Sequence, residues 1–189
     1  MGKPGRADFG DDLAYANKAR VLLEREYYPR VSRDGRFVGI ERSPGSLYIQ
    51  RHCHVDCILA SFQGGSVTFE EKIVRWPGYS YTAMTVETHS NLERCTKEGI
   101  DPEGIGDGWI ATSVADFLLY GFEQPDDSIR IWVFDLPKLR VWFNNCYRRY
   151  RISNTDNRLY TTRCRIVPLR DIAAGCVRVS DRLVQKGAR

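Results

Sequence analysis

The sequence predicts an α/β protein with a central mixed β-sheet flanked by helices. Three observations predict this class. An amphipathic helical pattern near the N-terminus is followed by two strand patterns that meet at a glycine turn. Later in the chain, a strongly apolar strand pattern leads directly into a second helical pattern. Strands alternating with helices in this way are typical of an α/β sheet.

Composition indicates a single globular domain over residues 1–189. Hydrophobic residues make up 42% and charged residues 28% of the chain, as in ordinary soluble proteins. The net charge of +4 permits an anionic polymer as partner. The sequence has no apolar run long enough for a membrane span and no apolar core of a secretory signal. We therefore expect no membrane partner and a cytoplasmic location, with a disordered N-terminus (residues 1–7) and a frayed C-terminus (residues 182–189).

The first helix is predicted over Asp8–Tyr28. Apolar residues recur there at three- and four-residue steps from Phe9 to Tyr27 and form one stripe. Pro29 is expected to end the helix, because the residue before a proline disfavours the helical conformation.

The next two elements are predicted to form a hairpin. Strands are expected over His54–Leu59 and Ser66–Val74. The segment Gln63–Ser66 between them contains two glycines, which can adopt the positive φ of a tight turn.

This hairpin carries charged side chains in a pattern that suggests a metal site. Side chains alternate along a strand, so Glu70 and Lys72 share one face, and Asp56 lies opposite them if the hairpin closes at the glycines. Mg²⁺ is usually held by one or two carboxylates with water and substrate phosphate. A lysine can stabilise charge on phosphorus or position a water nucleophile. The alternative is a solvated strand edge with cross-strand ion pairs, where acid-x-lysine triplets are common.

Asp56, followed fourteen positions later by Glu70-x-Lys72 on the next strand, resembles the PD-(D/E)XK nuclease superfamily. The resemblance covers about Asp8 to Leu169, and Val55 stands where the motif has proline. It implies a restriction-endonuclease-like core with elements in the order α-β-β-β-α-β. It also implies hydrolysis of DNA phosphodiester bonds to give 5′-phosphate ends.

The resemblance also implies a role for each motif residue. Asp56, Glu70 and the main-chain carbonyl of Glu71 would hold the cofactor, Mg²⁺ or Mn²⁺. Lys72 would orient the attacking water or stabilise the pentavalent phosphorus. Asp56, Glu70 and Lys72 are therefore the candidate catalytic residues.

Four further residues could belong to this site: Glu24, Glu26, Glu87 and His54. The first helix of the superfamily often contributes an acid, which could be Glu24 or Glu26, although solvated glutamates are the alternative for both. Glu87 lies near the end of a strand predicted over Thr82–Thr88. His54 shares a strand face with Asp56.

A zinc site is not expected. The six cysteines include no CxxC pair, and reduced thiols are expected for a chain without a secretory signal. The cluster His52-Cys53-His54-x-x-Cys57 contains four possible ligands. Strand alternation sends the histidines to one face and the cysteines to the other, so the four cannot surround one tetrahedral ion. Cys53 and Cys57 are predicted to be small core residues.

The second half of the chain is predicted to contain a loop, two helices and two strands. The strand over Ser128–Asp135 is strongly apolar and is expected to be buried on both faces. The other elements are the loop Glu98–Gly108, a helix Val114–Tyr120 capped by Thr112 or Ser113, a helix Leu136–Tyr147 and a strand Leu159–Val167.

The most basic stretch of the chain is a candidate nucleic-acid contact. It consists of Tyr147, Arg148, Arg149, Tyr150 and Arg151. Arginines interleaved with aromatic residues can contact phosphates and stack on bases. The alternative is a solvated helix end, where cations are favoured by the helix dipole. We expect DNA as the partner. A homodimer is a further hypothesis, since many superfamily members act on duplexes as dimers.

Three functions are therefore compared. The leading hypothesis is a Mg²⁺-dependent DNA nuclease. The second is a non-catalytic module on the same fold that binds nucleic acid or a protein. The third is a sugar- or nucleotide-handling enzyme with paired carboxylates, which would need a pocket lined by aromatic side chains.

Overall fold

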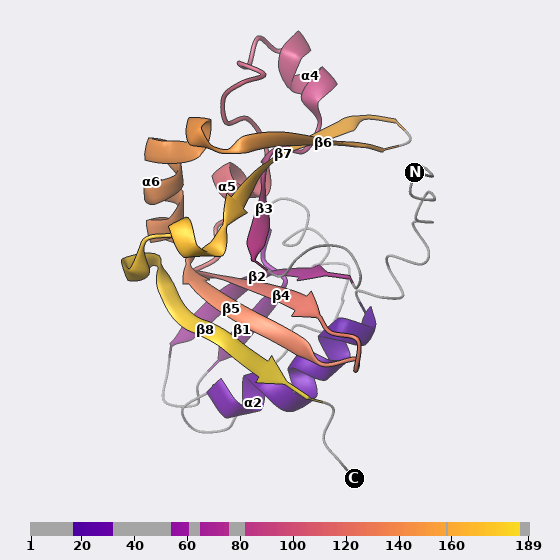
Figure 1. The fold of residues 1–189 in the computed structure, drawn as a ribbon, viewed down its shortest axis with the longest axis vertical. Helices are drawn as coiled ribbons and strands as arrows, with labels where there is room; N and C mark the ends of the chain where they lie inside the picture. Colours follow the sequence, from indigo (N-terminus) through magenta and orange to yellow (C-terminus); the bar gives the residue numbers. More distant parts are fainter. Residues whose placement is uncertain (1–16, 32–53, 61–64, 76–81, 158, 186–189) are drawn as a thin grey trace.

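The computed structural model describes residues 17–31, 54–60, 65–75, 82–157 and 159–185 (Figure 1). Within these ranges the protein is α/β, with a five-stranded mixed sheet, a three-stranded antiparallel sheet and two main helices. Several predicted features lie outside the described residues. They are the start of the first helix, His52, Cys53, most of the glycine turn and the segments 1–7 and 186–189.

The strands form two sheets, and the chain passes from one sheet to the other several times. The strands are β1 (Cys57–Ala60), β2 (Ser66–Val74), β3 (Ala83–His89), β4 (Phe117–Glu123), β5 (Ile129–Asp135), β6 (Arg151–Asp156), β7 (Thr161–Pro168) and β8 (Val177–Val184). The helical elements after the first helix are α4 (Leu92–Lys97), α5 (Trp109–Thr112), α6 (Leu136–Cys146), η2 (Tyr147–Arg149), η3 (Leu169–Asp171) and η4 (Ala174–Cys176). No helix in the described ranges is both long and apolar enough to cross a membrane.

The five-stranded sheet has the order β1-β2-β4-β5-β8, and the three-stranded sheet has the order β3-β7-β6. Strands β2 and β4 are parallel, whereas the other neighbours in the five-stranded sheet are antiparallel. A parallel pair needs a long crossover, and β3, α4 and α5 provide it. The prediction of a mixed sheet is therefore confirmed.

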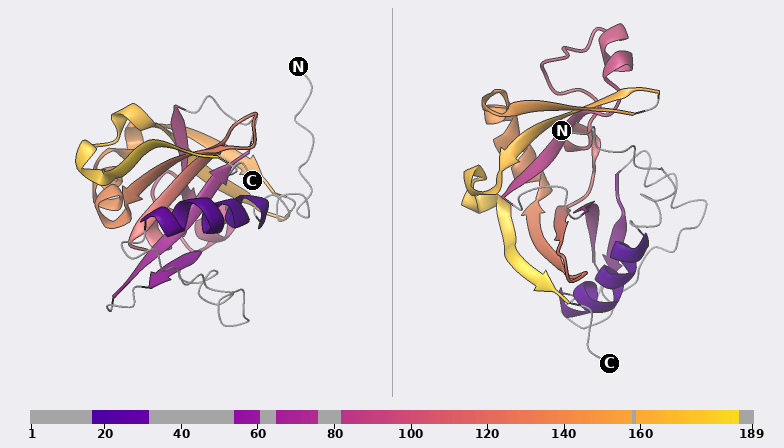
Figure 2. Two further views of the ribbon diagram at one scale, coloured as in Figure 1. Left: turned by 90° about the horizontal axis from the view of Figure 1, so that it is seen from below. Right: turned by 45° about the vertical axis from the view of Figure 1, so that its right-hand side comes forward.

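The five-stranded sheet is covered on both faces. The helix at residues 17–31 lies across one face, where Leu23 and Tyr28 pack against Phe69 in one buried cluster (Figure 2). Helices α5 and α6 and strand β3 cover the other face in a second cluster, which includes Leu118 and Phe143. The three-stranded sheet lies beyond this second face, in the upper half of Figure 1.

Strand β5 confirms the prediction of burial on both faces, with one exception. Ile129, Ile131 and Val133 belong to the cluster beneath the first helix, and Phe134 belongs to the opposite cluster. Arg130 is exposed.

The helix predicted over Val114–Tyr120 is wrong. The structure has a single short helix, α5, before this segment, and Phe117–Glu123 forms β4 between β2 and β5. The run from Leu118 to Phe122 is buried throughout. A continuous apolar run fits a strand covered on both faces, so its tertiary position outweighs the helix cap at Ser113.

The predicted end of the first helix is also wrong, because the helix continues through Pro29. Residues 17–22 are α-helical, Leu23–Tyr27 (η1) form a π-helical turn and Tyr28–Val31 (α2) complete the helix. The Tyr28 N–H donates to the Leu23 carbonyl, five residues back. A proline in a regular helix clashes with the carbonyl four residues before it, and a widened turn at this point displaces that carbonyl.

Strands β6 and β8 and the short helices α4 and α5 were not predicted from the sequence. Strand β6 begins within the basic stretch, and α4 begins after Asn91, whose side chain accepts a hydrogen bond from the Arg94 N–H. Strand β8 extends to Val184 and pairs with β5, so regular structure reaches into the segment 182–189 that was expected to be frayed.

We expect Gly108→Ala to lower the free energy of unfolding by about 2–3 kcal/mol, because a methyl group has no room at this position. The Gly108 N–H donates to the Thr88 carbonyl at 3.0 Å, and an added Cβ would lie 2.3 Å from the Glu87 carbonyl oxygen. Denaturant unfolding measures the change. Gly175→Ala is the control, since nothing lies within 4 Å of a Cβ there. Equal stability of the two variants would contradict the close packing of Gly108 against β3.

Candidate active site

Asp56 is held at the start of the β1–β2 hairpin by two hydrogen bonds. β1 and β2 pair with Cys57 opposite Phe69, so Asp56 lies opposite Glu70 one step further along. The Asp56 N–H donates to the Phe69 carbonyl at 2.8 Å. The Asp56 carboxylate accepts through Oδ2 from the Glu71 N–H, also at 2.8 Å. The other oxygen, Oδ1, accepts no hydrogen bond from the residues that the structure describes.

Glu70 and Lys72 form an ion pair on one face of β2. The Lys72 Nζ lies 2.6 Å from Glu70 Oε1. The Glu70 side chain is 2% exposed, whereas that of Lys72 is 36% exposed, so the acid is inside and the base reaches the surface. The ion pair therefore compensates the charge of a carboxylate that is almost fully buried.

Burial and the neighbouring charges shift the pKa of both partners. Burial raises the pKa of Glu70 to about 7, Lys72 opposes this rise and Asp56 adds to it. Burial alone would lower the pKa of Lys72, but the charges of Glu70 and Asp56 outweigh burial and raise it. The three predicted catalytic residues thus interact electrostatically, with Glu70 and Lys72 in direct contact.

Glu87 and His54 border this group. Glu87 lies on β3, and its carboxylate accepts from the Ser90 hydroxyl at 2.5 Å. Its negative charge acts on the pKa of both Glu70 and Lys72. His54 has a left-handed backbone, with φ of 48°, and burial followed by the charge of Lys72 lowers its pKa. Its imidazole is therefore kept neutral more readily than an exposed one.

The Glu71 carboxylate lies on the opposite face of β2. It accepts a hydrogen bond from the Tyr28 hydroxyl of the first helix. Burial raises its pKa to about 7, and the charge of Asp56 adds to this rise. The strand alternation predicted from the sequence is thus confirmed, and only the main-chain carbonyl of Glu71 was expected to act as a ligand.

Glu24 and Glu26 pair with arginines of their own helix. Glu24 Oε1 lies 3.1 Å from Arg20 Nε. Glu26 contacts Arg25 at 2.8 Å and Arg30 at 3.2 Å. Neither carboxylate is brought into contact with Lys72.

The structure adds supporting residues that the sequence analysis missed. The Ser113 hydroxyl donates to the His54 carbonyl at 2.8 Å, and Arg140 donates to the carbonyls of Ile110 and Ser113. Arg20 donates to the Asp56 carbonyl. These partners are separated from the site by 36 or more positions along the chain, so no local pattern could have revealed them.

Asp56 and Glu70 supply the two carboxylates that could hold Mg²⁺. No group of three or more His, Cys, Asp or Glu side chains in the described ranges is arranged to hold a metal ion. One or two carboxylates suffice for Mg²⁺ when water and phosphate supply the other ligands. Among the described residues, Asp56 Oδ1 has no hydrogen-bond donor, and Glu70 is a buried carboxylate whose charged form a cation would stabilise.

The basic stretch is divided between two surroundings. The Arg148 Nε donates to the Tyr147 hydroxyl at 3.1 Å, and the Tyr147 ring lies 5.4 Å from the Arg165 guanidinium. Arg149, Tyr150 and Arg151 line a separate hollow between α6 and β7.

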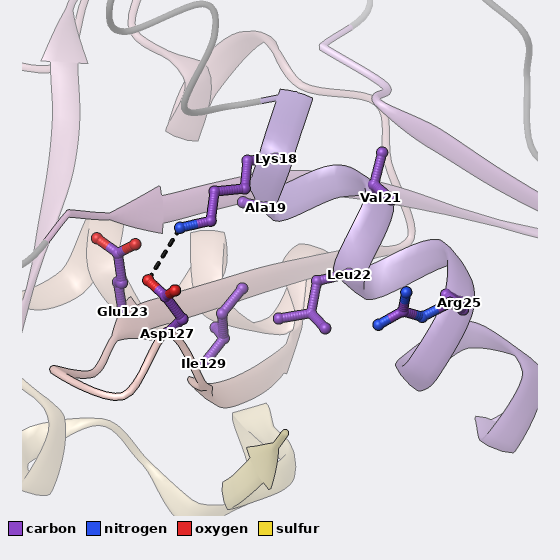
Figure 3. Close-up of a pocket in the computed structure, with 8 residues that line it drawn as sticks. All are labelled: Lys18, Ala19, Val21, Leu22, Arg25, Glu123, Asp127 and Ile129. Atoms are coloured by element: carbon purple, nitrogen blue, oxygen red, sulfur yellow. Dashed lines mark hydrogen bonds and ion pairs between the residues drawn. The ribbon is translucent and has the colours of Figure 1, made fainter. Parts of the chain in front are cut away.

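An apolar pocket lies away from the carboxylates. Its volume is about 230 Å³, and it lies between the first helix and the β4–β5 hairpin (Figure 3). Ala19, Leu22 and Ile129 form its apolar wall, and an ion pair of 2.9 Å between Lys18 and Asp127 crosses one side. None of the predicted catalytic residues lines it.

No protein-family model, curated protein or solved structure matches this chain.

We expect the free energy of unfolding to fall as the pH rises from about 4.5 to about 7. Burial raises the pKa of Glu70 and Glu71 from 4.5 to about 7, so the folded state binds protons more tightly than the unfolded chain. The two protonated carboxyls contribute their full stabilisation below about pH 4.5, the pKa in the unfolded chain. This stabilisation is lost as the pH rises through about 7, the pKa in the folded protein. Each extra bound proton changes the free energy by about 1.4 kcal/mol per pH unit. Denaturant unfolding with a metal chelator measures the slope.

Glu71→Gln is the matched variant for this prediction. It removes one titrating group, keeps an oxygen acceptor for the Tyr28 hydroxyl and should halve the part of the slope that the two carboxyls contribute. Carboxylates with a lowered pKa, such as Asp107 and Asp135, titrate below this window. Burial lowers the pKa of His54 and His89 from 6.5, so these two groups contribute a slope of the opposite sign. The difference in stability between the wild type and Glu71→Gln therefore isolates the carboxyl, and a difference that does not change across the window would contradict the prediction.

Proposed function

We propose that the protein is a metal-dependent nuclease of the PD-(D/E)XK superfamily that hydrolyses DNA phosphodiester bonds. The observation that carries this proposal is the buried Glu70 carboxylate, paired with Lys72 at 2.6 Å and opposed by Asp56 across an antiparallel hairpin. This is the arrangement of two acids and one lysine that such chemistry requires.

The order of elements agrees in part with a restriction-endonuclease-like core. From the first helix to β4, the order is helix, three strands, short helices and a strand, which agrees with an α-β-β-β-α-β core. Strand β4 lies parallel to β2, the strand that carries Glu70 and Lys72. The chain departs from a single-sheet core at β3, because β3 pairs with β7 and not with a strand of the five-stranded sheet.

Each side chain of the site has a role in the proposal. Asp56 and Glu70 would hold Mg²⁺, with the carbonyl of Glu71 as a further ligand. The bound ion would polarise the scissile phosphate and lower the pKa of a water nucleophile. Lys72 donates to oxygen and places a positive charge where negative charge develops on phosphorus. The high pKa of Lys72 keeps this side chain protonated at neutral pH.

A non-catalytic binding module is the second candidate, and one observation favours it. The Glu70–Lys72 ion pair satisfies both charges without a metal, and the described residues contain no three-ligand cluster. A module of this kind would bind nucleic acid or a protein but no metal. Isothermal titration of the wild-type protein with Mn²⁺ separates the two candidates, because only the nuclease binds the ion.

We expect Lys72→Ala to retain Mn²⁺ binding and to lower the cleavage rate about 10²–10³-fold, because its charge acts on the transition state. Asp56→Asn and Glu70→Gln should lose both metal binding and cleavage, since each removes a ligand charge. Isothermal titration with Mn²⁺ and a plasmid-nicking assay with Mg²⁺ measure the two properties.

Glu71→Gln is the control for these variants, because it changes the adjacent residue on the opposite face of β2. It should retain both metal binding and cleavage. If Asp56→Asn binds Mn²⁺ as tightly as the wild type, the carboxylates are not the ligands and the nuclease assignment fails.

A further inference from the structure

A hollow of about 590 Å³ opens between the end of α6 and the end of β7, near the η2 turn. Its size falls within the range of small-molecule pockets. Trp142, Tyr150 and Ile166 provide apolar surface, and Arg149, Arg151 and Asp171 provide charge. The hollow shares no residue with the Asp56, Glu70 and Lys72 site.

Two aromatic rings lie together in this hollow. The ring centroids of Trp142 and Tyr150 are 6.1 Å apart, and the planes are inclined by 43°. Both side chains are half-buried, so part of each ring faces the hollow. Burial raises the pKa of Tyr150 to about 12, which keeps its hydroxyl protonated at neutral pH.

The backbone fixes the position of Tyr150. Its N–H donates to the Tyr147 carbonyl at 3.1 Å, and its carbonyl accepts from the buried Arg165 side chain at 3.0 Å. Arg165 also binds the carbonyl of Glu103 at 2.7 Å. A ring held in this way loses little freedom when a ligand packs against it.

The two arginines of the hollow are available to a ligand. Arg149 and Arg151 are exposed, and neither guanidinium group makes a hydrogen bond or ion pair with any residue that the structure describes. Other arginines nearby are engaged, as Arg163 is with Asn154 and Arg178 is with Asp135. Two unpaired guanidinium groups beside aromatic rings form a surface for a ligand that is both anionic and flat.

We propose that this hollow binds one nucleotide of a single-stranded nucleic acid, with the base against Trp142 and Tyr150 and the phosphates on Arg149 and Arg151. A base in a duplex is stacked on its neighbours, whereas a base in a single strand is free to pack against aromatic rings. The Asp171 carboxylate also lines the hollow, with Oδ1 3.7 Å from Arg170 Nε, and its oxygens can accept hydrogen bonds from base amino or imino groups. An acidic peptide would use the arginines but would leave the rings without a matching flat partner.

The experiment measures binding of labelled oligothymidylate and oligouridylate to the full chain by fluorescence anisotropy, with a chelator present to prevent cleavage. Trp142→Ala should weaken binding about tenfold or more, because stacking on one base is lost. Arg149→Ala and Arg151→Ala should each weaken binding and reduce the slope of log affinity against log salt by about 0.7. Equal binding of the two oligomers shows that the site accepts both, and stronger binding of one identifies the oligomer that the site prefers.

Matched variants test whether oligomer binding depends on the residues of the hollow or on positive charge anywhere on the surface. Arg130→Ala removes an exposed arginine on β5 that lies outside the hollow, and it should leave binding unchanged. Arg148→Ala removes a charge next to Arg149, but its guanidinium lies against the Tyr147 ring, so it should weaken binding less than Arg149→Ala. Trp142→Phe keeps an aromatic ring and serves as the test variant if Trp142→Ala does not fold. It should retain most of the binding but lose the quenching of tryptophan fluorescence that the oligomer causes.

Several results would overturn the proposal. They are unchanged binding by Trp142→Ala, equal losses for Arg148→Ala and Arg149→Ala, and competition by polyglutamate as strong as that by oligothymidylate. The last of these results would indicate an acidic protein partner. Asp56→Asn should bind the oligomers as the wild type does. The two proposals can therefore fail separately. If the hollow does not bind the oligomers, the hollow variants leave binding unchanged; if the protein is not a nuclease, cleavage is absent while binding to the hollow remains.

Discussion

The structure depends most on how β2 accommodates two adjacent acids, the buried Glu70 and the half-buried Glu71. Glu70 and Glu71 point to opposite faces of the strand, and an unpaired carboxylate on either face would carry a large desolvation cost. Lys72 provides the partner for Glu70 on the face toward β3, and the Tyr28 hydroxyl provides the partner for Glu71 on the face toward the first helix. The helix and the second sheet therefore both need β2 in its observed register, since a shift of one residue would exchange the two acids between faces.

Asp56 contacts both β2 and the first helix. Its carboxylate accepts the Glu71 N–H, and its carbonyl accepts from Arg20 of the first helix. The same negative charge raises the pKa of Glu70, Glu71 and Lys72. A site assembled from like charges in this way costs stability, and such a cost is typical where function requires the charges to be close. A bound cation would relieve the repulsion between the carboxylates more completely than Lys72 alone.

The second sheet adds a surface that the motif by itself does not imply. The end of the η2 turn and the start of β6 place Arg149, Tyr150 and Arg151 around the hollow that Trp142 of α6 also lines, while Tyr147 and Arg148 lie in different surroundings. A contiguous run of five residues therefore has two different environments. The separation follows from the change from the η2 turn to the extended β6, which alters the direction of successive side chains.

Elements with a local pattern could be predicted from the sequence. Periodicity and a permitted proline predict the face alternation along Ser66–Val74, the apolar strand Ile129–Asp135 and the helix after it. The other elements depend on contacts between distant segments of the chain. Phe117–Glu123 became a strand because β2 and β5 enclose it, and the first helix continued past Pro29 because a π turn displaced the opposing carbonyl. The partners of Asp56, His54 and Tyr150 come from distant positions, and contacts across such separations leave no periodic signal in one sequence.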